Sequence, residues 1–337
     1  MKIVFFEASK AEQDIFLKSF NETGVSFYEE KLNEDNTEKA KNAEIISVFV
    51  NSKISKKVID QIPDLKFITT RSTGFDHIDI EYARTKGISV SNVPAYGSQT
   101  VAEFTFGLLL TLSRRIYWGY HQLREGNNFD LSQLEGFDLE GKILGVIGTG
   151  KIGQNVIRIA KGFRMKVIAT NPNPKPELAL ELGFEYVSLD DLLSQSDIIT
   201  IHVPYMPATH HLINSANLAK IKRGAILINT ARGEIVETEA LLSALNDGRI
   251  KGAALDVLEG ERDLKEERLI TMGSDPKIGH MENMRKIVED HVLINLPNVI
   301  VTPHMAFFTK EAVGRIIETT VENIKGFISG TAQNIVQ

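Results

Sequence analysis

The sequence of 337 residues contains no cysteine, so disulfide bonds, thiolate metal ligands and thiol nucleophiles are excluded. It also lacks an excess of basic charge: the net charge is −6, which argues against nucleic-acid binding as the main function. No apolar run approaches the length of a membrane span. The apolar stretch Ile3–Phe6 is too short for a secretory signal. We therefore expect a cytoplasmic protein with no nucleic-acid or membrane partner.

The residues that are present are typical of a globular protein, with 42% hydrophobic and 24% charged residues. The length suggests two domains. Strand and helix patterns alternate along both halves, which predicts parallel sheets covered on both faces. Strands of a first α/β unit are predicted at 2–7, 25–28, 44–50, 66–71 and 88–92. Those of a second unit are predicted at 143–147, 166–170, 198–202, 225–230, 252–257 and 299–302.

A glycine-rich turn stands between a buried strand and a helix start in the second unit. Its glycines, Gly148, Gly150 and Gly153, form a G-x-G-x-x-G motif. The first permits a tight turn, the second lets the backbone approach a pyrophosphate, and the third lets the helix pack closely on the strand. The helix N-terminus, with Lys151 and Ile152, then offers free N–H groups to the phosphates. The motif predicts a dinucleotide site; a glycine-rich turn that binds nothing is the alternative.

These patterns predict an α/β protein with two Rossmann-like or flavodoxin-like doubly wound domains and an active-site cleft between them. The apolar helix at 100–115 leads into the second domain, and the last helix, at 310–328, returns to the first. The substrate-binding domain is therefore predicted to be discontinuous, 1–99 with 305–337, and the dinucleotide-binding domain to be 100–304. The charged stretch 264–290 is interpreted as a solvated insertion with some helix and no chemical role.

Residue 171, at the end of the second strand of this domain, is asparagine. An NAD-specific fold expects an acidic residue here to bind the ribose hydroxyls. Asn171 can still hydrogen-bond a hydroxyl, but it does not repel a 2′-phosphate, and Lys175 can attract one. The prediction is NAD as cofactor with weakened discrimination, so use of NADP stays open.

Three polar residues, Arg232, Glu261 and His304, each follow a predicted strand. Loops that leave the carboxyl ends of parallel strands line the ligand crevice. Arginine holds a carboxylate bidentately and polarises a carbonyl, and histidine suits proton transfer near neutral pH. A glutamate against the histidine would favour its protonated form. Taken singly, each residue also has a purely structural explanation. Arg232 would be an ion-pair anchor, Glu261 an exposed acid and His304 a strand cap.

Further motifs accompany these residues along nearly the whole chain. They are RSTGFDHID (71–79), NVPAY (92–96), VAE (101–103), the glycine motif (148–153), HVP (202–204), NTARG (229–233), LDVLEGE (255–261) and TPHMAF (302–307). Together, in this order, they resemble the D-isomer-specific 2-hydroxyacid dehydrogenases, most closely the D-lactate dehydrogenase branch. The resemblance implies NAD-dependent reduction of a 2-oxo acid to the D-2-hydroxy acid. Pyruvate is the favoured substrate, and a larger 2-oxo acid is the alternative.

The resemblance also implies a role for each matching residue. Arg232 would bind the carbonyl and carboxylate, Glu261 would hold the histidine, and His304 would be the acid/base. Substrate contacts would come from Thr73, Gly74, Tyr96 and Phe307. Cofactor contacts would come from Gly148, Gly150, Lys151, Ile152, Gly153, Asn171, His202, Val203, Pro204, Thr209, Thr230, Ala231 and Asp256, the last near the nicotinamide.

Other interpretations concern partners and metals. Some relatives of the family are NAD(H)-sensing corepressors that use the fold as a scaffold, but the chain lacks motif-bearing tails. Packing alone also explains His202, Tyr96 and Phe307. No metal is expected, because adjacent His210 and His211 would diverge on a strand. The apolar helix at 100–115, followed by Trp118 and Tyr120, predicts burial against a second subunit and so a homodimer.

Overall fold

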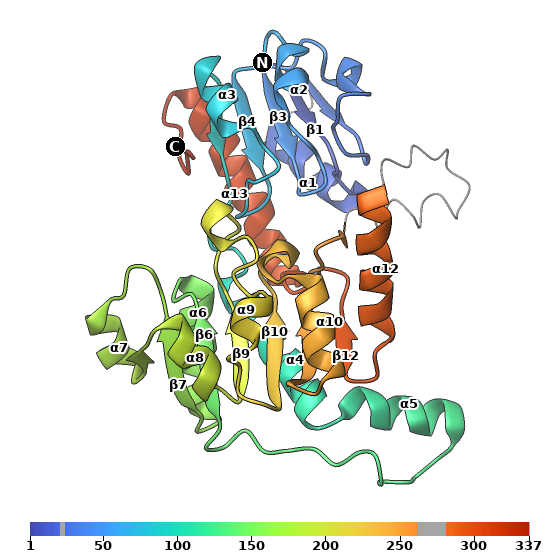
Figure 1. Ribbon diagram of the computed structural model, residues 1–337. Helices are drawn as coiled ribbons and strands as arrows, with labels where there is room; N and C mark the ends of the chain where they lie inside the picture. The colour runs from blue at the N-terminus through green and yellow to red at the C-terminus, as the bar shows by residue number, and fades with distance from the viewer. Residues whose placement is uncertain (21–23, 262–263, 265–280, 337) are drawn as a thin grey trace. The chain divides into compact units, whose positions relative to one another are not determined.

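The structure is a computed structural model that describes residues 1–20, 24–261, 264 and 281–336 (Figure 1). The chain forms two compact units, one of Met1–Tyr96 with Phe308–Gln337 and one of Gly97–Phe307. Both ends of the chain thus belong to the first unit. Each unit is built on its own parallel sheet, and the predicted fold class of two α/β domains is confirmed.

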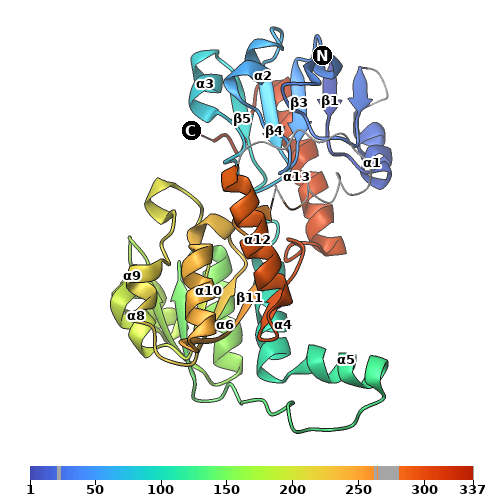
Figure 2. The same cartoon turned by 45° about the vertical axis from the view of Figure 1, so that its right-hand side comes forward.

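The sheet of the first unit has the strand order β2-β1-β3-β4-β5. Its strands alternate between two cores, since Ile3 and Ile45 face one side and Val4 and Ile46 the other. Helices α1 (Lys10–Phe20) and α13 (Lys310–Ser329) cover the first side, and α2 (Lys56–Asp60) and α3 (Ile80–Thr85) the second (Figure 2). The short helix η1 is Thr37–Ala40. The strands are β1 (Ile3–Phe5), β2 (Val25–Phe27), β3 (Ile45–Val48), β4 (Phe67–Thr70) and β5 (Ser89–Ser91).

The sheet of the second unit has the order β12-β11-β10-β9-β6-β7-β8, and its neighbouring strands pair in parallel. The chain runs outward from β6 to β8 and returns to pair β9 with the other side of β6. The order therefore reverses between β6 and β9, where open α/β sheets bind ligands. The strands are β6 (Ile143–Ile147), β7 (Lys166–Thr170), β8 (Glu185–Tyr186), β9 (Ile198–Ile201), β10 (Ala225–Asn229), β11 (Ile250–Leu255) and β12 (Val299–Val301).

Helices pack on both faces of this second sheet. Leu144, Val146 and Ile228 share a core with α4 (Ser98–Ser113) and α6 (Lys151–Gly162). The opposite face packs against α8 (Leu189–Gln195), α9 (Ser215–Leu218), α10 (Thr238–Asn246) and α12 (Met281–Asn295) (Figure 1). The remaining helices are α5 (Ile116–Gly126), α7 (Pro176–Leu182), η2 (Pro207–Thr209) and η3 (Gly233–Ile235).

Two features of the second unit differ from the sequence analysis. Helices α5 and α7 and the short strand β8 were not predicted. The interpretation of 264–290 as solvated is wrong at its end, because α12 includes Asp290, whose side chain is fully buried. The helix predicted in part of this stretch packs on the sheet, which its charged sequence does not indicate. Residues 265–280 lie outside the described part of the chain.

Candidate active site

Arg232, Glu261 and His304 follow three neighbouring strands. Arg232 comes after β10, Glu261 after β11 and His304 after β12, and these strands pair in the order β12-β11-β10. Because parallel strands end at the same edge of a sheet, the three loops meet at the carboxyl edge of the second sheet. The glycine turn after β6, Asn171 after β7 and His202 after β9 leave the sheet at this same edge.

Glu261 and His304 form a direct pair. Nδ1 of His304 lies 3.1 Å from each carboxylate oxygen of Glu261. Both side chains are only partly buried, so a substrate can reach the ring. His304 has a φ of +56°, a left-handed conformation that is uncommon for any residue except glycine. The turn that presents the ring is therefore held by its surroundings.

Asp256 holds that turn. Its side chain is buried, and its two oxygens accept hydrogen bonds from Oγ1 of Thr302 at 2.5 Å, from the Met305 N–H at 2.9 Å and from the Ala306 N–H at 2.8 Å. Burial raises the pKa of Asp256, while these hydrogen bonds lower it in part. Thr302 was given no role in the sequence analysis; its signal is a hydroxyl two residues before His304. The predicted contact of Asp256 with the cofactor stays a prediction.

Arg232 stands at the start of η3, in a turn that its neighbours fix. Nδ2 of Asn229 donates to the Arg232 carbonyl at 2.8 Å, and the Arg232 guanidinium donates to the Ala231 carbonyl at 2.8 Å. A Cβ atom at Gly233 would lie 2.1 Å from the carbonyl of Leu258. Glycine is therefore required, because the backbone after Arg232 packs directly on the segment that leads to Glu261.

The glycine turn is shaped by close backbone approaches. Gly148 has a φ of +97°, and a Cβ atom there would lie 2.6 Å from the His202 carbonyl oxygen. A Cβ atom at Gly153 would lie 2.0 Å from the Gly148 carbonyl oxygen, whereas at Gly150 it would meet nothing within 4 Å. Gly150 thus faces open space at the N-terminus of α6. The N–H groups of Lys151 and Ile152 have no intrahelical acceptor there. This geometry fits a pyrophosphate.

The H-V-P turn lies against this glycine turn. A Cβ atom at Gly148 would also lie 2.8 Å from Cγ1 of Val203. Oγ1 of Thr209 donates to the Pro204 carbonyl at 2.8 Å and so closes the turn. Nε2 of His202 lies 2.8 Å from Oγ1 of Thr200, while its buried Nδ1 has no hydrogen-bond partner among the described residues. Burial lowers the pKa of His202 to about 3, so the ring is neutral.

The expectation that His210 and His211 diverge on a strand is wrong. They follow η2, outside any strand, and their rings stack with centroids 4.0 Å apart. His211 takes a φ of +48°, which turns its ring back beside that of His210. In the part of the chain that the structure describes, no group of three or more His, Cys, Asp or Glu side chains is arranged to hold a metal ion.

Three further predicted cofactor residues have local partners. Nδ2 of Asn171 donates to the Asn173 carbonyl at 2.7 Å, so the amide folds back on its own loop. Thr230 is buried, and its hydroxyl lies 3.2 Å from that of Thr105 on α4. Ala231, which follows it, donates its N–H to Oδ1 of Asn229 at 3.0 Å. These contacts fix the loops after β7 and β10.

The predicted substrate contacts divide between the two units. Thr73 and Gly74 follow β4 in the first unit, where Nδ2 of Asn92 donates to the Thr73 carbonyl at 2.8 Å. Tyr96 is in the same unit, and its carbonyl accepts from Nε of Arg315 at 2.7 Å. Phe307 is the last residue of the second unit. The structure thus assigns each residue to a unit and places none of them against a substrate.

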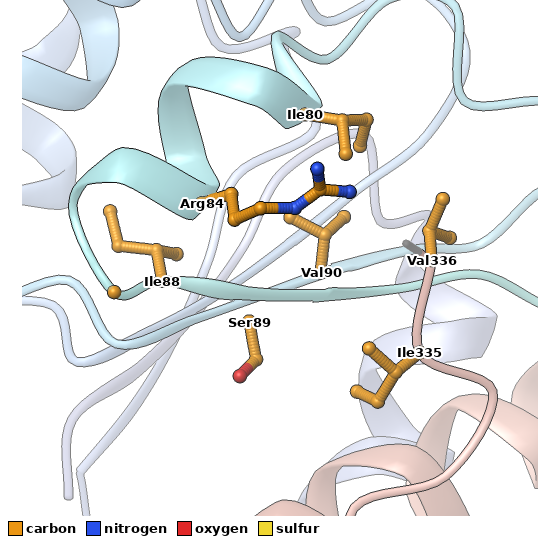
Figure 3. A pocket seen from close by; sticks show the side chains of 8 residues that line it. Ile80, Arg84, Ile88, Ser89, Val90, Ile335 and Val336 are labelled. Carbon is orange, nitrogen blue, oxygen red and sulfur yellow. The ribbon is translucent and has the colours of Figure 1, made fainter.

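A cavity of about 260 Å³ lies elsewhere in the first unit (Figure 3). It is lined by α3, by β5 and by the C-terminal segment that pairs with β5 through Ser91 and Ile335. Arg84 is the charged residue of its lining, and it also pairs with Glu81 at 3.3 Å. No candidate site residue lines this cavity.

Comparisons with known proteins agree with this fold. A family model described as D-isomer specific 2-hydroxyacid dehydrogenase, NAD binding domain, matches residues 106–306. The D-lactate dehydrogenase of Escherichia coli K12 is 36% identical over 338 residues, 98% of each chain. An aromatic 2-oxoacid reductase of Clostridium sporogenes is 39% identical over 301 residues, 88% of this chain and 86% of that one. The crystal structure of Aquifex aeolicus D-lactate dehydrogenase with NAD and lactic acid has a TM-score of 0.88 at 36% identity, covering 98% and 96%.

The fold and the glycine turn define a dinucleotide-dependent enzyme. The family match is more specific: the chain belongs to the D-isomer-specific 2-hydroxyacid dehydrogenase family and is similar to its D-lactate dehydrogenase branch, as predicted. It is an NAD-dependent oxidoreductase that acts on a CH–OH donor. Among the described residues, no helix is both long and apolar enough to cross a membrane. A cytoplasmic location stays a prediction.

Proposed function

We propose that the protein reduces a 2-oxo acid, with pyruvate favoured, to the D-2-hydroxy acid. The pair of Glu261 and His304 at the edge of the second sheet carries this proposal. NAD, in its reduced form, supplies the hydride when bound; the glycine turn and the H-V-P turn are the proposed binding residues. His304 supplies the proton, and Arg232 holds the substrate.

The geometry of the pair supports Nε2 of His304 as the nitrogen that transfers the proton. Nδ1 of His304 faces both carboxylate oxygens of Glu261, so in the imidazolium it donates its proton to them. The second ring nitrogen, Nε2, then delivers a proton to the substrate oxygen. The Glu261 carboxylate thus orients the His304 ring, as a third group orients the base in many enzymes.

Substrate binding is proposed to follow from the planar guanidinium of Arg232. Two parallel N–H donors match a carboxylate, and the same group polarises the neighbouring carbonyl. The backbone N–H groups near Thr73 and Gly74 are proposed as further carboxylate donors, with Tyr96 and Phe307 as apolar contacts. In these terms the first unit is the substrate-binding domain and the second the dinucleotide-binding domain.

A rate panel tests the proposal. Pyruvate, a branched 2-oxo acid and an aromatic 2-oxo acid are compared with NADH as reductant, and pyruvate is expected to give the highest kcat/KM. A higher value for the larger acids would select the alternative substrate, which the aromatic 2-oxoacid reductase among the relatives supports. Failure of all three would contradict the proposed reaction and favour a non-enzymatic scaffold.

We propose in addition a homodimer formed through α5. This helix buries none of its own residues, and Figure 1 shows it projecting from the second unit. Its Tyr117 and Tyr120, with Phe129 and Leu131 in the segment that follows, are all exposed. Several large exposed apolar side chains on one helix and the segment after it are typical of a protein interface. The second copy is the proposed occupant, because α5 continues directly from α4, the helix predicted to meet a second subunit.

A further inference from the structure

Helix α12 contacts the segment that carries Glu261. Asp290 of this helix is fully buried, and its Oδ2 accepts a hydrogen bond from the Gly260 N–H at 3.1 Å. A Cβ atom at residue 260 would lie 2.6 Å from that oxygen. Glycine therefore allows the carboxylate to reach the backbone at this position. The other oxygen of Asp290 has no hydrogen-bond partner within the described ranges.

Glu259 fixes the residue immediately before Gly260. Its Oε1 accepts from Nζ of Lys286 on α12 and from Nε2 of His211, each at 2.9 Å. Its Oε2 accepts from the N–H of Thr238 at 3.3 Å and from the Thr238 hydroxyl at 3.0 Å. The side chain is only 5% exposed. Glu259 thus joins α12, the start of α10 and the loop after η2.

The two acids of this cluster, Glu259 and Asp290, have pKa values shifted in opposite directions. Burial opposes ionisation of Glu259, but the hydrogen bonds from Lys286 and His211 lower its pKa to about 2. Burial raises the pKa of Asp290 to about 7, against the hydrogen bond from Gly260. Glu259 and Glu289 also raise it, and Lys286 lowers it. Glu259 is therefore an anion. Asp290 does not need a charge for its contact, because an acceptor oxygen is enough to bind the Gly260 N–H.

Glu261 follows these two anchored residues directly. Its carboxylate is centred on His304, with both oxygens at the same distance from Nδ1. A shift of the backbone at residue 260 is passed to residue 261 through one peptide unit, since that unit is planar and rigid. A misplacement of about 1 Å in a catalytic group can cost about a hundredfold in rate.

We propose that Asp290 and Glu259 are positioning residues for the reaction, which hold Gly260 and so keep the Glu261 carboxylate on Nδ1 of His304. The inference rests on the proposed acid/base role of His304. Neither acid touches the reacting atoms. The competing explanation is that the two acids contribute to folding alone. It predicts that their replacement lowers the amount of active protein and leaves the kcat of the folded protein unchanged.

Variants of Asp290 separate the two explanations. Asp290→Ala removes the acceptor and is expected to lower kcat for pyruvate reduction about tenfold to a hundredfold, with KM within about threefold. Asp290→Asn keeps an oxygen for Gly260 and is expected to stay within about threefold of the parent. Glu289→Ala is the matched control on the same helix, because the partner of Glu289, at 2.8 Å, is Arg285 of α12 and not the backbone of Gly260. It is expected to leave kcat unchanged.

A double variant tests whether Asp290 acts through Glu261. In the Glu261→Gln background, Asp290→Ala is expected to cost less than threefold, since the pair it would disturb is already lost. A cost equal to that in the parent would overturn the inference. If Glu261→Gln alone left turnover unchanged, the proposed function and the inference would both fail. If Glu261→Gln were slow while Asp290→Ala resembled the parent, the inference alone would fail.

Discussion

His304 and Glu261 meet through one nitrogen and two oxygens, with Nδ1 3.1 Å from both carboxylate atoms. This contact directs Nε2 of the ring away from the carboxylate. It also joins the loop after β12 to the loop after β11, two neighbouring strands of one sheet. The acid/base assignment is therefore open to direct tests.

Replacement of His304 by glutamine is the first test. Glutamine preserves polarity at the turn but cannot carry a titrating proton, so we expect kcat to fall by about a hundredfold to ten-thousandfold. Binding of NADH, measured by fluorescence titration, is expected to stay nearly the same, because the glycine turn is separate from this loop. Unchanged turnover would remove His304 from the mechanism.

Two glycines of the G-x-G-x-x-G motif provide a matched pair. Gly153→Ala would place Cβ 2.0 Å from the Gly148 carbonyl oxygen, and such overpacking costs about 1–3 kcal/mol of folding free energy. Gly150→Ala meets nothing within 4 Å and is expected to fold normally. Its methyl group would occupy the space that the pyrophosphate needs, so we expect NADH affinity to fall at least about tenfold, which is about 1.4 kcal/mol.

Thermal melts and NADH titrations of both variants check this contrast. Normal stability of Gly153→Ala would contradict the close packing of α6 on the glycine turn. Normal NADH affinity of Gly150→Ala would place the pyrophosphate elsewhere.

The fold was largely predictable from sequence where a strand is a short apolar run with clear local ends. Strands β6 and β7 have the predicted bounds, because each is a short apolar run that ends at a polar or glycine residue. Helix α5 was missed because it buries none of its residues and so shows no core-facing pattern. Helix α12 begins in a stretch that was predicted to contain some helix, but its packing was missed, since Lys286 and Asp290 contact Glu259 and Gly260, a contact that no local pattern records.

The candidate site was also predictable only in part, because some of its contacts join residues that are far apart in the sequence. The strand-end positions of Arg232, Glu261 and His304 follow from the alternation of strands and helices along the chain. The anchoring of the His304 turn by Asp256 links residues that are about fifty positions apart. The sequence does contain one signal for the α12 contact, a glycine between two acids at 259–261. This signal can be interpreted only together with Asp290, which lies on helix α12.

Cofactor selectivity is the third prediction. The Asn171 amide folds onto the Asn173 carbonyl and carries no charge to repel a 2′-phosphate, so we expect weak discrimination between NADH and NADPH. Asn171→Asp is expected to raise the preference for NADH, because its carboxylate binds ribose hydroxyls and repels phosphate. The ratio of kcat/KM for the two cofactors measures this. A preference above about a thousandfold in the parent, roughly 4 kcal/mol, would contradict weak discrimination.

The oligomeric state is the fourth prediction. Sedimentation at micromolar concentration is expected to give a dimer, and Tyr120→Asp, on the exposed face of α5, is expected to shift it toward monomer. Leu180→Asp is the matched control, since Leu180 on α7 is also exposed and Figure 1 shows α7 on the opposite side of the second unit from α5. A monomer in the parent would end the proposal that α5 forms the interface.

The last prediction concerns stability and pH, and it follows from Asp290. Burial raises the pKa of this side chain to about 7, while the unfolded chain has the usual value of 3.8. Between these values the native state keeps a proton that the unfolded state has released. The contribution of Asp290 to the free energy of unfolding is therefore fully present at low pH and declines as pH rises from about 4 to about 7. The loss is at most about 4 kcal/mol, given about 1.4 kcal/mol per pKa unit.

Denaturant unfolding at several pH values measures this effect when the parent is compared with Asp290→Asn. Asparagine cannot ionise, so the parent is expected to lose stability relative to the variant on going from pH 4 to pH 8. Other titrating groups occur in both proteins and largely cancel in the difference. A difference that stays constant over this range would show that Asp290 is not protonated in the native state, and the buried carboxylate would then need a cation as its partner.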